Sequence, residues 1–233
     1  MSKLKAQTVF AALVLTTSLS TGVLTARALA ENAIVVPPST MTEPVTGAGM
    51  EKAVLAGGCF WGVQGVFQHV KGVQNAVSGY AGGKADTAVY ETVSGGETGH
   101  AESVEITFDP QVINYATLLQ IYFSVVHNPT ELNHQGADMG TQYRSAIFPA
   151  SDAQAQVAKA YIEQLNKAAV FKAPIVTTIE PSKTFYAAEA YHQDYLTLHP
   201  TQPYIAFNDI PKVKDLSHVF PSLYSEKPKL VKG

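Results

Sequence analysis

The sequence predicts an α+β fold: a single-domain, two-layer sandwich in which helices pack on a mixed sheet, with a ferredoxin-like core and long loops. Two observations favour this class. Short segments with strand-like patterns are interleaved with amphipathic helical stripes, and no internal repeat is present. The length of 233 residues and the formal net charge of -3 suit one globular domain with tails and offer no basic surface for nucleic acid.

Residues 1–30 have the form of a cleavable export signal. Lys3 and Lys5 give a positive start, residues 9–24 are largely apolar and uncharged, and Ala28-Leu29-Ala30 matches a small-x-small cleavage site. Threonines and serines interrupt the apolar run, which is short for a membrane span. We therefore expect an exported, periplasmic protein with no stable membrane insertion once the signal is removed.

Three further segments follow the signal. Residues 31–51 are rich in Pro, Thr and Ser without periodicity, which predicts a flexible leader. The folded domain is expected over residues 52–224. The Lys- and Pro-rich residues 225–233 are typical of a mobile tail.

The first strand and helix of the domain meet at the chain's one cysteine. Residues 53–56 form an apolar strand, and apolar side chains from Phe60 onward recur at helical spacing. Cys59 thus lies at a helix start, where free N–H groups and the helix dipole favour the thiolate and predict a pKa below about 8.5. A lone cysteine is more often a small buried apolar residue. Glycines at positions 57, 58 and 62 favour instead a nucleophile that substrate approaches closely.

The later elements are predicted from periodicity and from turn and capping signals. In chain order they are a strand at 73–80, a strand at 102–108, a helix at 115–126, a polar loop at 130–143, a strand at 144–148, a helix from the capping box 151–154 to about 167, a strand at 175–179 and an aromatic helical segment at 185–198.

Glu102 is the carboxyl group of most interest. In the strand 102–108, Val104, Ile106 and Phe108 share one face, and the alternation puts Glu102 on that apolar face. Burial there raises the pKa of a carboxyl group and makes it a proton donor near neutral pH. The ordinary alternative is a strand-end glutamate that turns out to water.

Metal and cofactor sites are not expected. Glu189 and His192 have a spacing that suits one metal ligand pair, but di-iron helices need two such pairs and further carboxylates. The single cysteine excludes both an internal disulfide and a thiolate cluster for zinc within this sequence.

Several blocks of sequence resemble one family, the A-type peptide methionine sulfoxide reductases, over about Val54 to Tyr204. The blocks are Gly-Cys-Phe-Trp-Gly at 58–62, Ser-Gly-Tyr-Ala-Gly-Gly at 78–83, Gly-His-Ala-Glu at 99–102, Gln-Gly-Ala-Asp-Met-Gly-Thr-Gln-Tyr-Arg-Ser at 135–145 and Tyr-His-Gln-Asp-Tyr at 191–195. The resemblance implies reduction of methionine S-sulfoxide, free or in oxidised proteins, to methionine, and thus protein repair under oxidative stress.

The resemblance also implies two principal catalytic residues. Cys59 matches the nucleophile that attacks the sulfoxide sulfur, and Glu102 matches the acid that protonates the sulfoxide oxygen. Physical chemistry agrees, because a sulfoxide oxygen leaves poorly unless it is protonated.

Five further residues match site positions of the family. Tyr90 and Tyr143 match hydroxyls that hydrogen-bond the oxygen, and Phe60 and Trp61 match the ring pocket for the substrate methyl group. Asp138 matches a loop residue of the site with a less direct role.

The regeneration step departs from the family's common pattern. Loss of methionine leaves a sulfenic acid on Cys59, and many members reduce it with further cysteines near the carboxyl end, which this sequence lacks. We therefore expect an external reductant, either a thioredoxin-like protein or a small thiol.

Two other functions fit parts of the sequence. A cysteine hydrolase or acyltransferase would use Cys59 with a histidine base such as His100 or His192. A non-catalytic binding module would use Phe60 and Trp61 only to anchor exposed apolar side chains.

Overall fold

The fold centres on a six-stranded mixed sheet in the order β7-β6-β1-β3-β2-β8. The computed structural model describes residues 33–44, 47, 49–181 and 184–231. All neighbouring strands are antiparallel except β6 and β7, which are parallel. The strands are β1 (Glu51–Ala56), β2 (Val73–Ala81), β3 (Ala101–Phe108), β6 (Ala146–Phe148), β7 (Thr178–Ile179) and β8 (Tyr186–Ala187).

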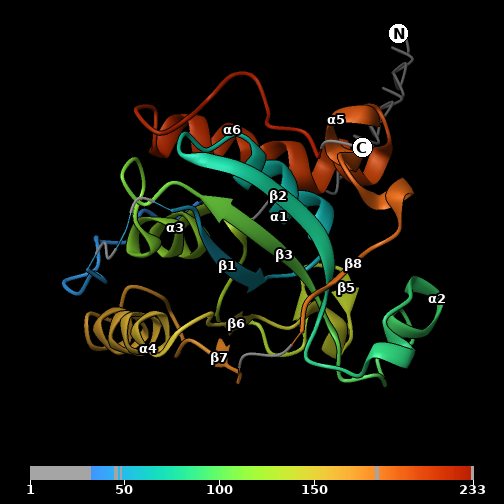
Figure 1. Ribbon diagram of the computed structural model, residues 1–233, viewed down its shortest axis with the longest axis horizontal. Helices are drawn as coiled ribbons and strands as arrows, with labels where there is room; N and C mark the ends of the chain where they lie inside the picture. The colour runs from blue at the N-terminus through green and yellow to red at the C-terminus, as the bar shows by residue number, and fades with distance from the viewer. Residues whose placement is uncertain (1–32, 45–46, 48, 182–183, 232–233) are drawn as a thin grey trace, which may run out of the picture.

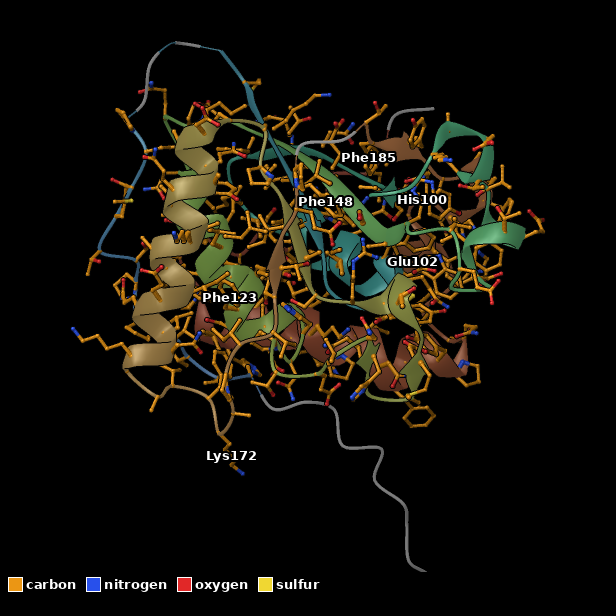
Figure 2. All side chains as sticks on the ribbon, turned by 90° about the horizontal axis from the view of Figure 1, so that it is seen from below. His100, Glu102, Phe123, Phe148, Lys172 and Phe185 are labelled. Carbon is orange, nitrogen blue, oxygen red and sulfur yellow. The ribbon has the colours of Figure 1, made fainter. Side chains whose placement is uncertain are left out.

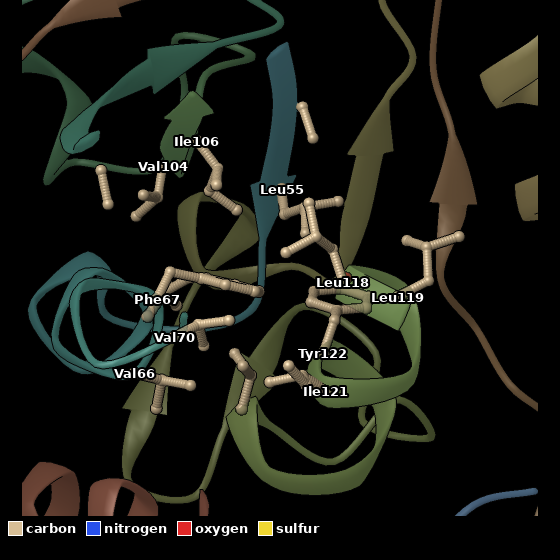
Figure 3. Close-up of a cluster of buried hydrophobic side chains, with 14 of the residues drawn as sticks. Leu55, Val66, Phe67, Val70, Val104, Ile106, Leu118, Leu119, Ile121 and Tyr122 are labelled. Carbon is tan, nitrogen blue, oxygen red and sulfur yellow. The ribbon is translucent and has the colours of Figure 1, made fainter. Parts of the chain in front are cut away.

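The inner part of this sheet is the predicted ferredoxin-like core. It consists of β1, α1 (Phe60–Gln68), β2, β3, α3 (Tyr115–Ile121) and β6, with the strands ordered β6-β1-β3-β2. Both helices lie on the same side of the strands (Figure 3). Leu55, Val104 and Ile106 point from the sheet toward Phe67 and Leu118, and this layer forms the main core.

The remaining elements surround this core. Helix α4 (Asp152–Lys167) lies at the β6–β7 edge of the sheet and α6 (Ile210–Val219) packs on α1, whereas α2 (Tyr90–Val93) projects at the opposite edge (Figure 1). The short elements are η1 (Ala85–Thr87), η2 (Tyr122–Val126), the ribbon of β4 (His134–Gln135) and β5 (Asp138–Met139), η3 (Thr141–Tyr143), η4 (Ala190–His192), α5 (Tyr195–Leu198) and η5 (Ile205–Asp209). The polar loop 130–143 is thus partly ordered as a ribbon.

The predicted capping box at 151–154 begins α4, with one difference from the usual pattern. Ser151 begins α4 by accepting a hydrogen bond from the backbone N–H of Gln154 at 3.1 Å. The side chain of Gln154 reaches back one residue further than in the usual capping box and accepts from the N–H of Ala150 at 3.0 Å.

The predicted aromatic helix at 185–198 is wrong. This segment contains β8, the single turn η4 and the four-residue helix α5. Gln193 bonds through its side chain to the backbone N–H and C=O of Ser78, and Asp194 has a left-handed φ of 59°. These contacts with β2 replace the backbone hydrogen bonds of a continuous helix.

The described parts of the predicted leader and tail are held against the domain. Ile34 donates from its backbone N–H to Ser124, and Tyr161 donates to the carbonyl of Pro37. Lys229 donates to the carbonyl of Gln68. The flexible leader at 31–51 and the mobile tail at 225–233 stay predictions, and these hydrogen bonds show only that Ile34, Pro37 and Lys229 contact the domain. The predicted signal at 1–30 lies outside the described residues, among which no helix is long and apolar enough to cross a membrane.

Candidate active site

The turn between β1 and α1 places Cys59 at the start of the helix, as predicted. Gly58 has a φ of 83°, a conformation that favours glycine. The reason for Gly62 differs from the predicted one: a Cβ atom at this position would lie 2.2 Å from Oδ1 of Asp209. The glycine accommodates a buried carboxyl group rather than a substrate.

One cavity of about 180 Å³ gathers every residue that the sequence assigned to the site. Its walls come from one end of the sheet, where β1 ends and β3 begins, and from loops far apart along the chain. The lining residues are Cys59, Phe60, Trp61, Tyr90, Glu102, Asp138, Tyr143 and Tyr204. Seven of these eight residues are the sequence-predicted ones, and Tyr204 is the addition.

Glu102 is buried at the start of β3, with 2% of its surface exposed. It does not turn out to water: its Oε2 accepts a hydrogen bond from the backbone N–H of Phe60 at 3.0 Å. In Figure 2 it lies beside His100 and far from Phe123 and Lys172. Burial raises the pKa of Glu102 to about 8, although the Phe60 N–H opposes this shift. The carboxyl group therefore holds its proton at neutral pH.

The prediction of a lowered pKa for Cys59 is wrong. Burial raises the pKa of the Cys59 thiol well above its ordinary value, and the nearby carboxyl groups of Glu102 and Asp209 add to the increase. The N–H of Trp61 in the first helical turn favours the thiolate, but it is outweighed. Cys59 is therefore a thiol until its surroundings change.

The carboxyl-terminal part of the chain holds the aromatic wall in place. The indole of Trp61 stacks on Tyr195 with ring centroids 3.9 Å apart, and its Nε1–H donates to Nδ1 of His192 at 3.2 Å. Because that nitrogen accepts, the proton of the neutral imidazole resides on Nε2. Phe60 lies against Tyr80 and His192. The ring pocket is thus fixed before substrate arrives.

Glu189 orients the loop that carries Tyr90. Its two carboxylate oxygens accept from the backbone N–H of Tyr90 at 3.0 Å and from the hydroxyl of Tyr80 at 2.9 Å. Glu189 and His192 are both engaged in hydrogen bonds around the site. Among the described residues, no group of three or more His, Cys, Asp or Glu side chains is arranged to hold a metal ion.

Tyr204 is the site residue that the sequence did not reveal. Its hydroxyl donates to Oδ2 of Asp138, and its ring meets Trp61 edge-on with centroids 6.1 Å apart. It lies between Pro203 and the turn η5, outside any periodic pattern or recognised block. Only the folded chain brings it to Cys59.

The histidines do not supply a base for hydrolysis. His100 accepts from the N–H of Gly83 at 3.2 Å and donates to the carbonyl of Lys84 at 2.9 Å, and His192 is bonded to Trp61. The cavity lining as described contains no histidine. A thiol, a neutral carboxyl group and tyrosines around an aromatic pocket define a cysteine-dependent oxidoreductase.

Comparison with known proteins identifies the family. Residues 51–222 match the family model described as peptide methionine sulfoxide reductase, and the chain belongs to that family. It is 68% identical over 183 residues to peptide methionine sulfoxide reductase MsrA 2 of Mesorhizobium japonicum, which covers 78% of this chain and 94% of that protein. It is 51% identical over 179 residues to MsrA of Deinococcus radiodurans, covering 77% and 85%.

Two solved structures with related sequences match the fold of this chain. Reduced Mxr1 from Saccharomyces cerevisiae matches with a TM-score of 0.59 and 34% identity, covering 72% of this chain and 94% of that one. Methionine sulfoxide reductase A of Corynebacterium diphtheriae matches with a TM-score of 0.56 and 30% identity, covering 73% and 86%. The protein is a peptide-methionine (S)-S-oxide reductase that uses thiols as reductant, and the hydrolase alternative has no support.

Proposed function

We propose that Cys59 and Glu102 carry out the reduction of methionine S-sulfoxide in the cavity that they share. The observation that carries this proposal is a buried, protonated carboxyl group and a buried thiol on the walls of the same aromatic-lined cavity. Cys59 attacks the sulfoxide sulfur as a thiolate while Glu102 gives its proton to the sulfoxide oxygen. The oxygen passes to Cys59 as a sulfenic acid, and methionine leaves.

The other cavity residues hold the sulfoxide in a reactive orientation. The hydroxyls of Tyr90 and Tyr143 donate to the sulfoxide oxygen, where negative charge develops before protonation. Phe60 and Trp61 receive the methyl group of the thioether, which favours an apolar wall. Asp138 acts through Tyr204, to whose hydroxyl it is bonded.

The sulfenic acid on Cys59 needs an external thiol. The sequence has one cysteine, so no second thiol of this chain is available to form a disulfide with it. A thioredoxin-like protein or a small thiol fills this role.

Single-turnover chemistry tests the residue roles without any reductant. Reduced protein mixed with L-methionine S-sulfoxide should yield one methionine per Cys59, and the R epimer should yield none. Cys59→Ser should yield none with either epimer. Trapping by dimedone, which reacts with sulfenic acids, should label the wild-type protein only after the S epimer is added. Absence of the methionine burst in correctly folded wild-type protein would overturn the proposal.

We also propose that the protein works outside the cytoplasm, in the periplasm, because residues 1–30 have the form of an export signal. The support is the positive start, the uncharged apolar run and the Ala28-Leu29-Ala30 site. Cell fractionation of the full chain, with amino-terminal sequencing of the product, tests this. A mature protein that begins at Glu31 in the periplasmic fraction is expected, and an uncleaved cytoplasmic protein would contradict it.

A further inference from the structure

Cys59 borders a second cavity besides the one that holds the proposed substrate site. This second cavity, of about 50 Å³, lies on the side of the β4–β5 ribbon and the turn η5. It is lined by Cys59, Gln135, Gly136, Ala137, Asp138, Tyr204, Asn208 and Lys212. The carboxyl group of Glu102, the rings of Phe60 and Trp61, and the other two tyrosines do not belong to its lining as described.

A hydrogen-bonded pair of side chains borders both cavities. Asp138 and Tyr204 border both of them, and the tyrosine hydroxyl donates to the aspartate. Cys59 borders both cavities as well. The second cavity is therefore another described route to Cys59, besides the cavity in which the sulfenic oxygen would form beside Glu102. In-line displacement at sulfur needs a nucleophile on the side away from the departing oxygen.

The two cavities also differ in charge. Lys212 lines the second cavity together with the carboxyl group of Asp138, whereas the described lining of the substrate cavity has carboxyl groups and no cationic side chain. The Nζ of Lys212 lies 3.6 Å from Oδ1 of Asp209 and 3.2 Å from the position that a Cβ on Gly62 would occupy, so it touches the first turn of α1. The side chain is 18% exposed and therefore reaches both the solvent and the interior.

We propose that the second cavity is the entrance for a small anionic thiol that reduces the sulfenic acid on Cys59, with Lys212 as its binding cation. This inference rests on the proposed function. The chain's single cysteine requires an external thiol, and a positive charge attracts a thiolate and stabilises it against protonation. The small volume of the cavity favours a small molecule over a protein loop.

The chemistry balances with two equivalents of thiol. The first thiol loses its proton, and its sulfur forms an S–S bond to Cys59 while the S–O bond breaks. The departing oxygen takes up that proton and leaves as water. Cys59 is reduced to a mixed disulfide as the thiol is oxidised. A second thiol then displaces Cys59, which returns to the thiol form, and the symmetrical disulfide is released.

The test compares two thiols with the same mercaptoethyl chain, the anionic 2-mercaptoethanesulfonate and the neutral 2-mercaptoethanol. Protein converted to the sulfenic acid by one turnover is mixed with each thiol, and the second-order rate constant of its reduction is measured at equal thiolate concentration. The preference for the anion is the rate constant with 2-mercaptoethanesulfonate divided by that with 2-mercaptoethanol. Lys212→Met should lower this ratio by about fivefold, which is the effect of one partly screened charge at close range. Lys212→Arg should keep the ratio. Lys214→Met, which removes an exposed lysine of the same helix, should also keep it.

The outcomes separate this inference from the proposed function. Failure of wild-type protein to form methionine in the first turnover removes the proposed function itself. A normal burst with an unchanged thiol ratio in Lys212→Met overturns the inference alone. The inference alone is also overturned if Lys212→Met slows the reduction of the sulfenic acid only when a thioredoxin-type protein is the reductant. Because Asp209 is buried and loses its partner in Lys212→Met, the double variant Asp209→Asn/Lys212→Met is measured in parallel and should show the same loss of preference.

Discussion

The role of Glu102 as a proton donor can be tested without changing the size or shape of its side chain. Glu102→Gln keeps the side chain volume and an oxygen for the Phe60 N–H, but it removes the acidic proton. The rate of methionine formation in a single turnover should fall by about 10²- to 10⁴-fold, as for loss of a general acid. Rapid-quench analysis of methionine measures this. Glu105→Gln, on the same strand and paired with Lys52, is the control and should react at the wild-type rate.

The same substitution should stabilise the protein in a pH-dependent way. Burial raises the pKa of Glu102 from an ordinary 4.5 to about 8, so the folded state binds the proton more tightly than the unfolded state. The contribution of this group to stability is full below pH 4.5 and is lost as the pH rises through about 8. At pH 8, Glu102→Gln should raise the free energy of unfolding by about 2–4 kcal/mol. Urea denaturation at pH 8 and pH 5 measures the difference, and an equal gain at both values would refute the burial argument.

At the scale of single elements, helix α1 depends on the glycine in its first turn. Gly62→Ala would place a methyl group 2.2 Å from Asp209 Oδ1, a clash that should destabilise the fold by about 1–3 kcal/mol. Helix propensity alone predicts a change of the opposite sign, because alanine is favoured over glycine in a helix by about 1 kcal/mol. Denaturant unfolding tests it. Gly95→Ala, whose Cβ would lie 3.4 Å from its nearest neighbour, should be near neutral, and adding Asp209→Ala to Gly62→Ala should recover part of the loss.

The sequence could predict those elements whose signals are local. Helix α1 and the inward direction of Glu102 follow from periodicity and alternation, which the main core enforces. The segment 185–198 could not be predicted, because the bonds of Gln193 to Ser78 in β2 decide its conformation. Tyr204 was missed for a similar reason, since its partner Asp138 is distant in sequence. The pKa of Cys59 depends on the carboxyl groups that the fold brings near it.

At the scale of the whole molecule, the substrate cavity exists only when distant parts of the chain are assembled. Cys59 comes from the turn between β1 and α1, Glu102 from the start of β3, and Tyr204 from the segment that precedes α6. The Trp61 wall is fixed by Tyr195 in α5. Because the carboxyl-terminal segment completes the aromatic wall and supplies Tyr204 to the lining of both cavities, loss of its packing should impair substrate binding before it unfolds the sheet.

The segment that precedes β1 contributes to stability rather than to chemistry. Val36 is 1% exposed within the main core, whereas its neighbour Val35 is 67% exposed. Gln120 donates to the carbonyl of Val36 at 2.9 Å, and Gln164 accepts from the N–H of Thr40 at 2.9 Å, which anchors the segment on α3 and α4. None of these residues lines either cavity at Cys59.

Val36→Asp and Val35→Asp therefore form a matched pair that tests this docking. Val36→Asp should lower the free energy of unfolding by about 2–4 kcal/mol, because it places an unpaired carboxyl group in the core or forces the segment off it. Val35→Asp, with the same change one residue away, should stay within about 0.5 kcal/mol of wild type. Denaturant unfolding gives both values. At temperatures where Val36→Asp is folded, its single-turnover yield should still be one methionine per Cys59. Equal stability of the two variants would mean that residues 33–41 do not hold this position in solution.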